Sequence, residues 1–143
     1  MIRSITRQKP EEDIDRLLEG LTRIFVIGCG TCVTLTCTGG AEQVRTMSEA
    51  LAERGKLITG DTVLPVACDN LTGEALKEQG PKIDQSDALL IMPCAFGVQT
   101  IARQSGKTVI PALDTLFVGK ESGVGRFDEI CIQCGSCILG ETG

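Results

Sequence analysis

Four short apolar runs alternate with amphipathic stretches along the chain. Runs rich in Val, Ile and Leu between turn residues are typical of strands buried in a parallel sheet. Apolar residues spaced by three and four positions, as at Val44, Met47 and Leu51, indicate helices with one buried face. The pattern predicts strands over residues 21–28, 62–67, 88–92 and 108–113, and helices over 10–19, 39–54, 72–79 and 96–104.

This alternation predicts an α/β fold: a small doubly wound, mostly parallel sheet with right-handed crossovers. In a flavodoxin-like strand order the first strand is central and its neighbours are the second and third strands. The polar, glycine-rich segment from Gly119 to Arg126 is typical of a linker. We therefore expect an α/β cluster-binding domain over 1–118, a linker over 119–130 and an incomplete cysteine-rich metal-binding tail over 131–143.

Composition narrows the functional classes. The 143 residues carry a formal net charge of −5 with no Trp or Tyr, which argues against nucleic-acid binding. No apolar run approaches the roughly 20 residues of a transmembrane segment, and the N-terminus lacks the apolar core of a signal peptide. We expect a cytoplasmic protein, and structural disulfides are rare in the cytoplasm. Eight cysteines and no histidine then indicate thiolate-rich metal sites, and exclude Cys/His zinc sites and Cys-His nucleophiles.

Three predicted strands each run up to a cysteine: Cys29, Cys68 and Cys94. Because the carboxyl ends of parallel strands meet at one edge of a sheet, these thiols should gather at one place. Cys32 follows Cys29 in a Cys-Gly-Thr-Cys motif, and Cys37 follows as a spare or substitute ligand. Four soft ligands at one edge predict a [4Fe–4S] cluster held by Cys29, Cys32, Cys68 and Cys94.

Other interpretations of the same residues stay open. The Cys29-x-x-Cys32 pair, between a strand and a helix, also fits a thioredoxin-like redox pair. Each strand-end cysteine could also be a small buried hydrophobe, although three in three strands favours a shared cofactor. A dinucleotide fingerprint is poorly matched, because Gly28-x-Gly30 lacks the third glycine. The scattered aspartates suit capping and solvation, so we predict no catalytic acid–base pair.

The tail contains the sharpest local motif, with cysteines at 131, 134 and 137. The Cys131-x-x-Cys134-x-x-Cys137 spacing is typical of a chain wrapped around an iron–sulfur cubane. Zinc is the alternative at this tail, although zinc ribbons more often use two separated pairs. A fourth ligand would come from Cys37 folding back or from a continuation beyond Gly143.

Several of these segments together resemble one family. They are GCGTC, TGGAEQV, the strand-end VAC and MPC, and CIQCGSCILGETG. The chain resembles the MetV-type partner subunit of bacterial methylenetetrahydrofolate reductase, which is related to a C-terminal extension of some such reductases. In the family the last segment continues through Gly-x-Cys-Pro into further cysteines, which are absent here. The family is sometimes labelled zinc-finger, which keeps zinc an alternative at the tail.

The resemblance implies a non-catalytic subunit of an oxidoreductase complex of anaerobic one-carbon metabolism (the Wood–Ljungdahl pathway). Its partners would be a MetF-type TIM-barrel flavoprotein, which reduces methylenetetrahydrofolate, and an electron-donating protein subunit. One or two [4Fe–4S] clusters would pass electrons to the flavin. The rival hypotheses are a zinc-binding structural or docking subunit of that complex and a stand-alone dithiol oxidoreductase.

Overall fold

A four-stranded parallel β-sheet forms the centre of the molecule. The computed structural model describes residues 1–138. The sheet has the order β3-β2-β4-β5, and every neighbouring pair is parallel. Its strands are β2 (Arg23–Cys29), β3 (Leu57–Leu64), β4 (Ala88–Ile91) and β5 (Thr108–Pro111). The expected α/β class with a parallel sheet is confirmed, and the strand order is consistent with a flavodoxin-like fold.

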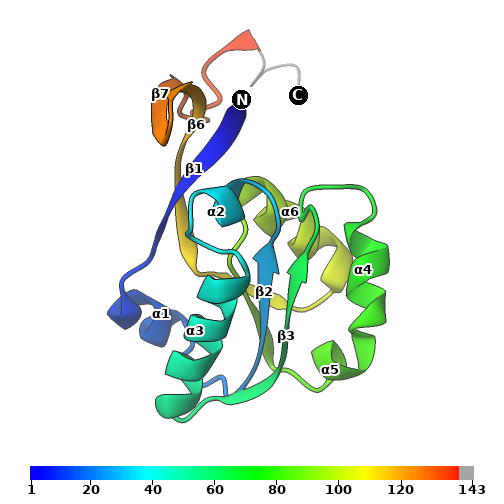
Figure 1. The fold of residues 1–143 in the computed structure, drawn as a ribbon. Coiled ribbons are helices and arrows are strands. Elements are labelled where there is room, and N and C mark those ends of the chain that lie inside the picture. Colours follow the sequence, from blue (N-terminus) through cyan, green and yellow to red (C-terminus); the bar gives the residue numbers. More distant parts are fainter. Residues whose placement is uncertain (139–143) are drawn as a thin grey trace.

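Helices cover both faces of this sheet, as Figure 1 shows. They are α1 (Glu11–Leu17), α2 (Cys32–Leu35), α3 (Ala41–Glu53), α4 (Thr72–Glu78), α5 (Gly80–Asp84) and α6 (Ala95–Ser105). Helix α3 packs on β2 and β3, whereas α4 packs against α6 on the opposite face. No helix within residues 1–138 is both long enough and apolar enough to cross a membrane.

The two central strands supply the core. Residues 24–27 of β2 and 88–91 of β4 are fully buried. Burial on both faces explains why these strands are continuous apolar runs rather than alternating ones. Leu51 of α3 and Ile101 of α6, both fully buried, close the core from either side of the sheet.

Strand β3 lies earlier in the chain than the 62–67 predicted from the apolar run. The strand ends at Leu64 because Pro65 has no N–H to donate to a ladder. Its first half contains Gly60, where a Cβ atom would lie 2.8 Å from the Phe25 ring. The pairing with β2 shifts register at that point. Because Gly60 interrupts the apolar run, the hydrophobicity pattern does not predict this part of the strand. Since the strand ends at Leu64, Cys68 lies in the loop after β3.

A second, antiparallel sheet was not predicted. It has the order β1-β6-β7 and consists of β1 (Ile2–Gln8), β6 (Leu113–Gly123) and β7 (Arg126–Cys131). The predicted linker over 119–130 is therefore wrong, because most of it is paired in β6 and β7. Gly119 allows close packing in this sheet, since a Cβ atom there would lie 3.0 Å from side-chain atoms of both Phe117 and Phe127.

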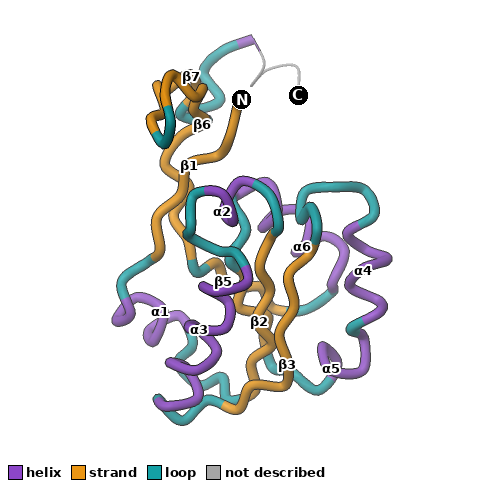
Figure 2. Tube along the Cα trace, viewed as in Figure 1, coloured by secondary structure: helices purple, strands orange, loops and turns teal. Residues whose placement is uncertain are grey.

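The small sheet extends away from the α/β unit on the side where α2 lies, as Figure 2 shows in orange. Strand β1 begins the chain and β7 leads into the cysteine-rich segment. The predicted tail over 131–143 begins at Cys131, the last residue of β7, and its last part, 139–143, lies outside the described residues. Cys131, Cys134 and Cys137 are all exposed.

Candidate metal centre

Four cysteines from three separate segments line one small cavity at the carboxyl edge of the parallel sheet. Cys29 is the last residue of β2 and Cys32 is the first residue of α2. Cys68 lies in the loop after β3, and Cys94 is the N-cap residue of α6, just after β4. All four border a cavity of about 80 Å³. The structure thus brings together the four residues that were predicted as ligands of one cluster.

The topology explains why these thiols meet. The chain passes from β2 to β3 on one side and then returns to β4 on the other side of β2. Between β2 and β4 the connections therefore diverge, which opens a crevice outside the strand ends. Cys29 and Cys94 flank this crevice and are 6% and 8% exposed, whereas Cys68 is exposed. The cavity is therefore deep at two thiols and open at the third.

The rest of the wall is tightly built from small and apolar residues. Ser4 of β1, only 5% exposed, reaches the cavity from the second sheet. A Cβ atom on Gly97 would lie 2.5 Å from the Cβ of Pro93 and 3.0 Å from that of Ala67. The remaining lining residues are Thr31, Val33 and Phe96. Among residues 1–138, no carboxylate, amine or guanidinium lines the cavity, so its donor set is dominated by sulfur.

Hydrogen bonds hold the Cys29 sulfur and its loop. The backbone N–H of Ala67 donates to Cys29 Sγ at 3.4 Å, and Thr31 Oγ1 lies 3.2 Å from the same sulfur. The hydroxyl of Thr34 donates to the Cys29 carbonyl at 2.6 Å. The Cys29 N–H donates to the carbonyl of Gly39 at 3.1 Å. These bonds fix the loop between β2 and α3 against the sheet edge.

The neighbouring thiols perturb Cys68. Burial raises the pKa of the Cys68 thiol, and negative charge on Cys94, Cys29 and Cys32 raises this pKa further. Without a cation, several thiolates so close together are therefore unfavourable. A bound metal would reverse this balance, because a coordinating thiol loses its proton.

The donor set fits a soft metal or an iron–sulfur cluster. Thiolates select zinc, Cu(I) and iron–sulfur clusters over hard cations such as Mg²⁺. The cavity of about 80 Å³ exceeds the roughly 10–15 Å³ that one water needs. Within residues 1–138, however, no three Cys, Asp or Glu side chains already converge as ligands of a single metal ion. The evidence for a site is therefore the shared cavity and its sulfur lining.

The second cysteine group begins at the end of β7 and is not among the residues that line the four-cysteine cavity. The Gln133 N–H donates to Cys131 Sγ at 3.3 Å. Hydrogen bonds from the backbone and side chain of Ser136 lower the pKa of the exposed Cys134 thiol. Gln133 and Gly135 have φ of +60° and +74°, in the left-handed region, so the chain turns sharply between the cysteines. This local geometry suits thiolate ligands, and the metal role of Cys131, Cys134 and Cys137 stays a prediction.

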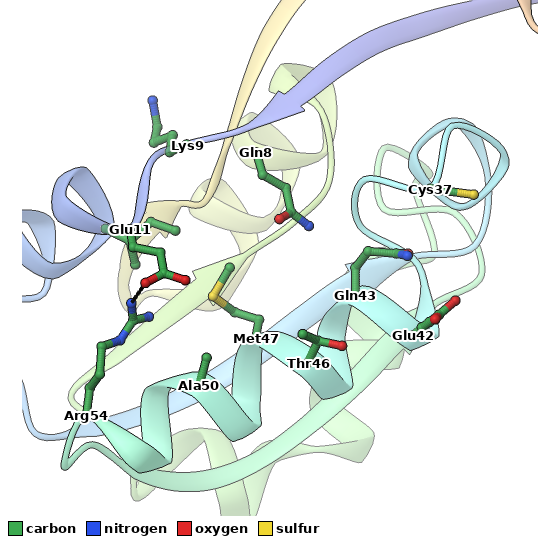
Figure 3. A pocket seen from close by; sticks show the side chains of 11 residues that line it. Gln8, Lys9, Glu11, Cys37, Glu42, Gln43, Thr46, Met47, Ala50 and Arg54 are labelled. Atoms are coloured by element: carbon green, nitrogen blue, oxygen red, sulfur yellow. Dashed lines mark ion pairs between the residues drawn. The ribbon is translucent and has the colours of Figure 1, made fainter.

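Cys37 does not line the four-cysteine cavity. It borders a different pocket of about 360 Å³ between β1, α1 and α3. Figure 3 shows Cys37 at one end of this pocket and the Arg54–Glu11 ion pair, at 3.1 Å, at the other. Sequence reasoning missed this pocket because its β1 wall was not predicted. Its cations are already engaged, Arg54 also with Asp15 and Lys9 with Asp114.

Comparisons with models of protein families, with curated proteins and with solved structures found no match to this chain.

Proposed function

We propose that this chain is an electron-transfer subunit that holds an iron–sulfur cluster at Cys29, Cys32, Cys68 and Cys94. The observation that carries the proposal is their convergence on one cavity at the switch point of the sheet. A redox-active dithiol needs only two of these residues, and buried structural thiols would not leave Cys68 exposed. A cluster uses all four, since a [4Fe–4S] cubane takes four thiolate ligands.

The surroundings of the four thiols support electron transfer rather than bond-making chemistry. The cluster would supply one-electron redox chemistry when it is bound. The chain itself contributes burial at Cys29 and Cys94, hydrogen bonds to sulfur, and an opening at Cys68. Burial and hydrogen bonding set the reduction potential of a cluster, and an opening shortens the path to a partner. No histidine is available as a general base.

The sequence resemblance suggests the partners. Electrons would pass from a donor protein to the flavin of a MetF-type catalytic subunit, which reduces methylenetetrahydrofolate. Cys131, Cys134 and Cys137 would hold a second cluster or a zinc ion, with a fourth ligand still to be identified. The sulfur-directed N–H of Gln133 and the lowered pKa of Cys134 favour metal binding there. A zinc-binding docking subunit of the same complex is the second candidate, because that local geometry suits zinc as well.

An anaerobic preparation of the full chain separates the hypotheses. Brown protein with matching iron and acid-labile sulfide supports the cluster, and colourless protein with bound zinc supports the scaffold. Metal-free protein that cycles a disulfide supports a dithiol oxidoreductase instead. A second step measures stopped-flow bleaching of the partner's flavin with wild type, Cys68→Ser and Cys37→Ser. We expect Cys68→Ser to slow bleaching while the matched control Cys37→Ser does not; equal rates in all three would contradict the electron-transfer role.

A further inference from the structure

Thr31 occupies a helix-capping position but does not cap the helix. It is the N-cap residue of α2, and its side chain makes no capping hydrogen bond. Threonine is ordinarily favoured there because its oxygen accepts a hydrogen bond from an N–H of the first turn. Here Oγ1 lies 3.2 Å from the sulfur of Cys29 instead. The hydroxyl is therefore directed at a candidate cluster ligand.

The direction of this hydrogen bond follows from the charge of the sulfur. A metal-bound cysteine is a thiolate and has no proton to donate, so the hydroxyl of Thr31 must be the donor. The Ala67 N–H supplies a second donor to the same sulfur from the loop after β3, at 3.4 Å. Cys29 is 6% exposed and Ala67 is fully buried. Hydrogen bonds to a charged acceptor are stronger in such a water-poor place.

We propose that the Thr31 hydroxyl raises the reduction potential of a cluster bound at Cys29 by donating a hydrogen bond to its thiolate. This inference rests on the proposed function. Reduction by the donor protein adds one electron to the cluster, and Thr31 keeps its proton in both states. Because the added electron makes the sulfurs more negative, the donor stabilises the reduced form more than the oxidised form. Removing the hydroxyl should disfavour reduction.

The test is a redox titration of the anaerobically reconstituted full chain, followed by its visible spectrum. Thr31→Val keeps the shape and removes the hydroxyl, and Thr31→Ser restores the hydroxyl. Thr36→Val is the matched control, because the Thr36 hydroxyl donates to the backbone carbonyl of Cys32, at 3.0 Å, rather than to a sulfur. We expect Thr31→Val to lower the equilibrium constant for reduction about tenfold, equivalent to about 59 mV for one electron. The other two variants should stay within twofold of wild type.

The outcomes separate this inference from the proposed function. Wild-type protein without iron and sulfide overturns both. A loaded cluster whose potential does not change in Thr31→Val, or changes as much in Thr31→Ser or Thr36→Val, overturns the role of the hydroxyl alone. Iron content is measured first, and Thr31→Ala is the second hydroxyl-free variant if Thr31→Val does not retain iron. Loss of iron from both hydroxyl-free variants but not from Thr31→Ser supports the hydrogen bond from the Thr31 hydroxyl to the cluster ligand Cys29. Loss of iron from all three variants contradicts it.

Discussion

Replacing Gly39 by alanine should destabilise the protein by forcing two backbone segments apart. A Cβ atom at Gly39 would lie 2.0 Å from the carbonyl oxygen of Met92. An ordinary carbon–oxygen contact is about 3.3–3.6 Å, so one segment must move by at least about 1.3 Å. Met92 is fully buried just after β4, and Gly39 accepts the N–H of Cys29. The movement therefore disturbs the edge that carries Cys29 and Cys94.

We expect Gly39→Ala to lower the free energy of unfolding by about 2–3 kcal/mol, which is typical of overpacking in a rigid core. For a chain of this length that corresponds to a fall in Tm of about 6–12 °C. The assay is urea and thermal unfolding followed by far-UV circular dichroism. Iron bound after anaerobic reconstitution gives a second readout, which should also fall because the cysteine loop has moved.

The matched control is Gly123→Ala in β6. The nearest atom to a Cβ there is the Arg126 Cβ at 3.9 Å, an ordinary contact. This variant should match wild type or gain up to about 1 kcal/mol from the stiffer unfolded chain. If Gly39→Ala is within about 0.5 kcal/mol of wild type, the close approach of the loop to Met92 is wrong.

Three further predictions concern other parts of the chain. Leu51→Ala, at a fully buried position in α3, should lower the free energy of unfolding by about 2–5 kcal/mol. The exposed Glu49→Ala should change this free energy, measured by unfolding in urea, by no more than about 0.5 kcal/mol. Hydrogen bonds from the Arg23 side chain and backbone lower the pKa of Asp87 to about 2 from 3.8, so its stabilisation is present above pH 3.8 and lost as pH falls towards 2. The free energies of unfolding of wild type and Asp87→Asn should therefore differ near neutral pH and converge at low pH. A difference that does not change with pH would refute a stabilising role of the Arg23–Asp87 ion pair. Cys134→Ser, at an exposed position beyond β7, should leave Tm unchanged, and a large fall in Tm would show that the tail supports the core.

The α/β unit could be predicted because its central strands are buried on both faces. The apolar runs of β2 and β4 are short and rich in Val, Ile and Leu, which favours buried strands, and α3 has a clear helical period. The second sheet could not be predicted, because its polarity is inverted. In β1 the buried residues are Ser4 and Thr6, whereas Ile2 is 62% exposed. The buried pair contacts the cysteine cavity and the Thr38 hydroxyl, which local hydrophobicity does not reveal.

The candidate site was predictable at the level of topology but not of detail. Parallel strand ends bring Cys29 and Cys94 together, and Cys68 reaches the cavity although its strand ends at Leu64. The hydrogen bond between the Thr31 hydroxyl and the Cys29 sulfur was not predictable, since threonine before a helix ordinarily indicates a cap. The hydrogen bond from the Ala67 N–H to the Cys29 sulfur could not be predicted from the sequence either, because every residue except proline has the same backbone donor.

The most direct test of the central claim is the iron and sulfide content of single cysteine variants reconstituted anaerobically. Each of four single serine variants, at Cys29, Cys32, Cys68 or Cys94, should lose about four irons and four sulfides per chain, because these residues hold one [4Fe–4S] cluster. Cys37→Ser should retain the wild-type content, since Cys37 borders a different pocket. Full iron content in Cys68→Ser and Cys94→Ser, or an equal loss in Cys37→Ser, would contradict the four-cysteine site.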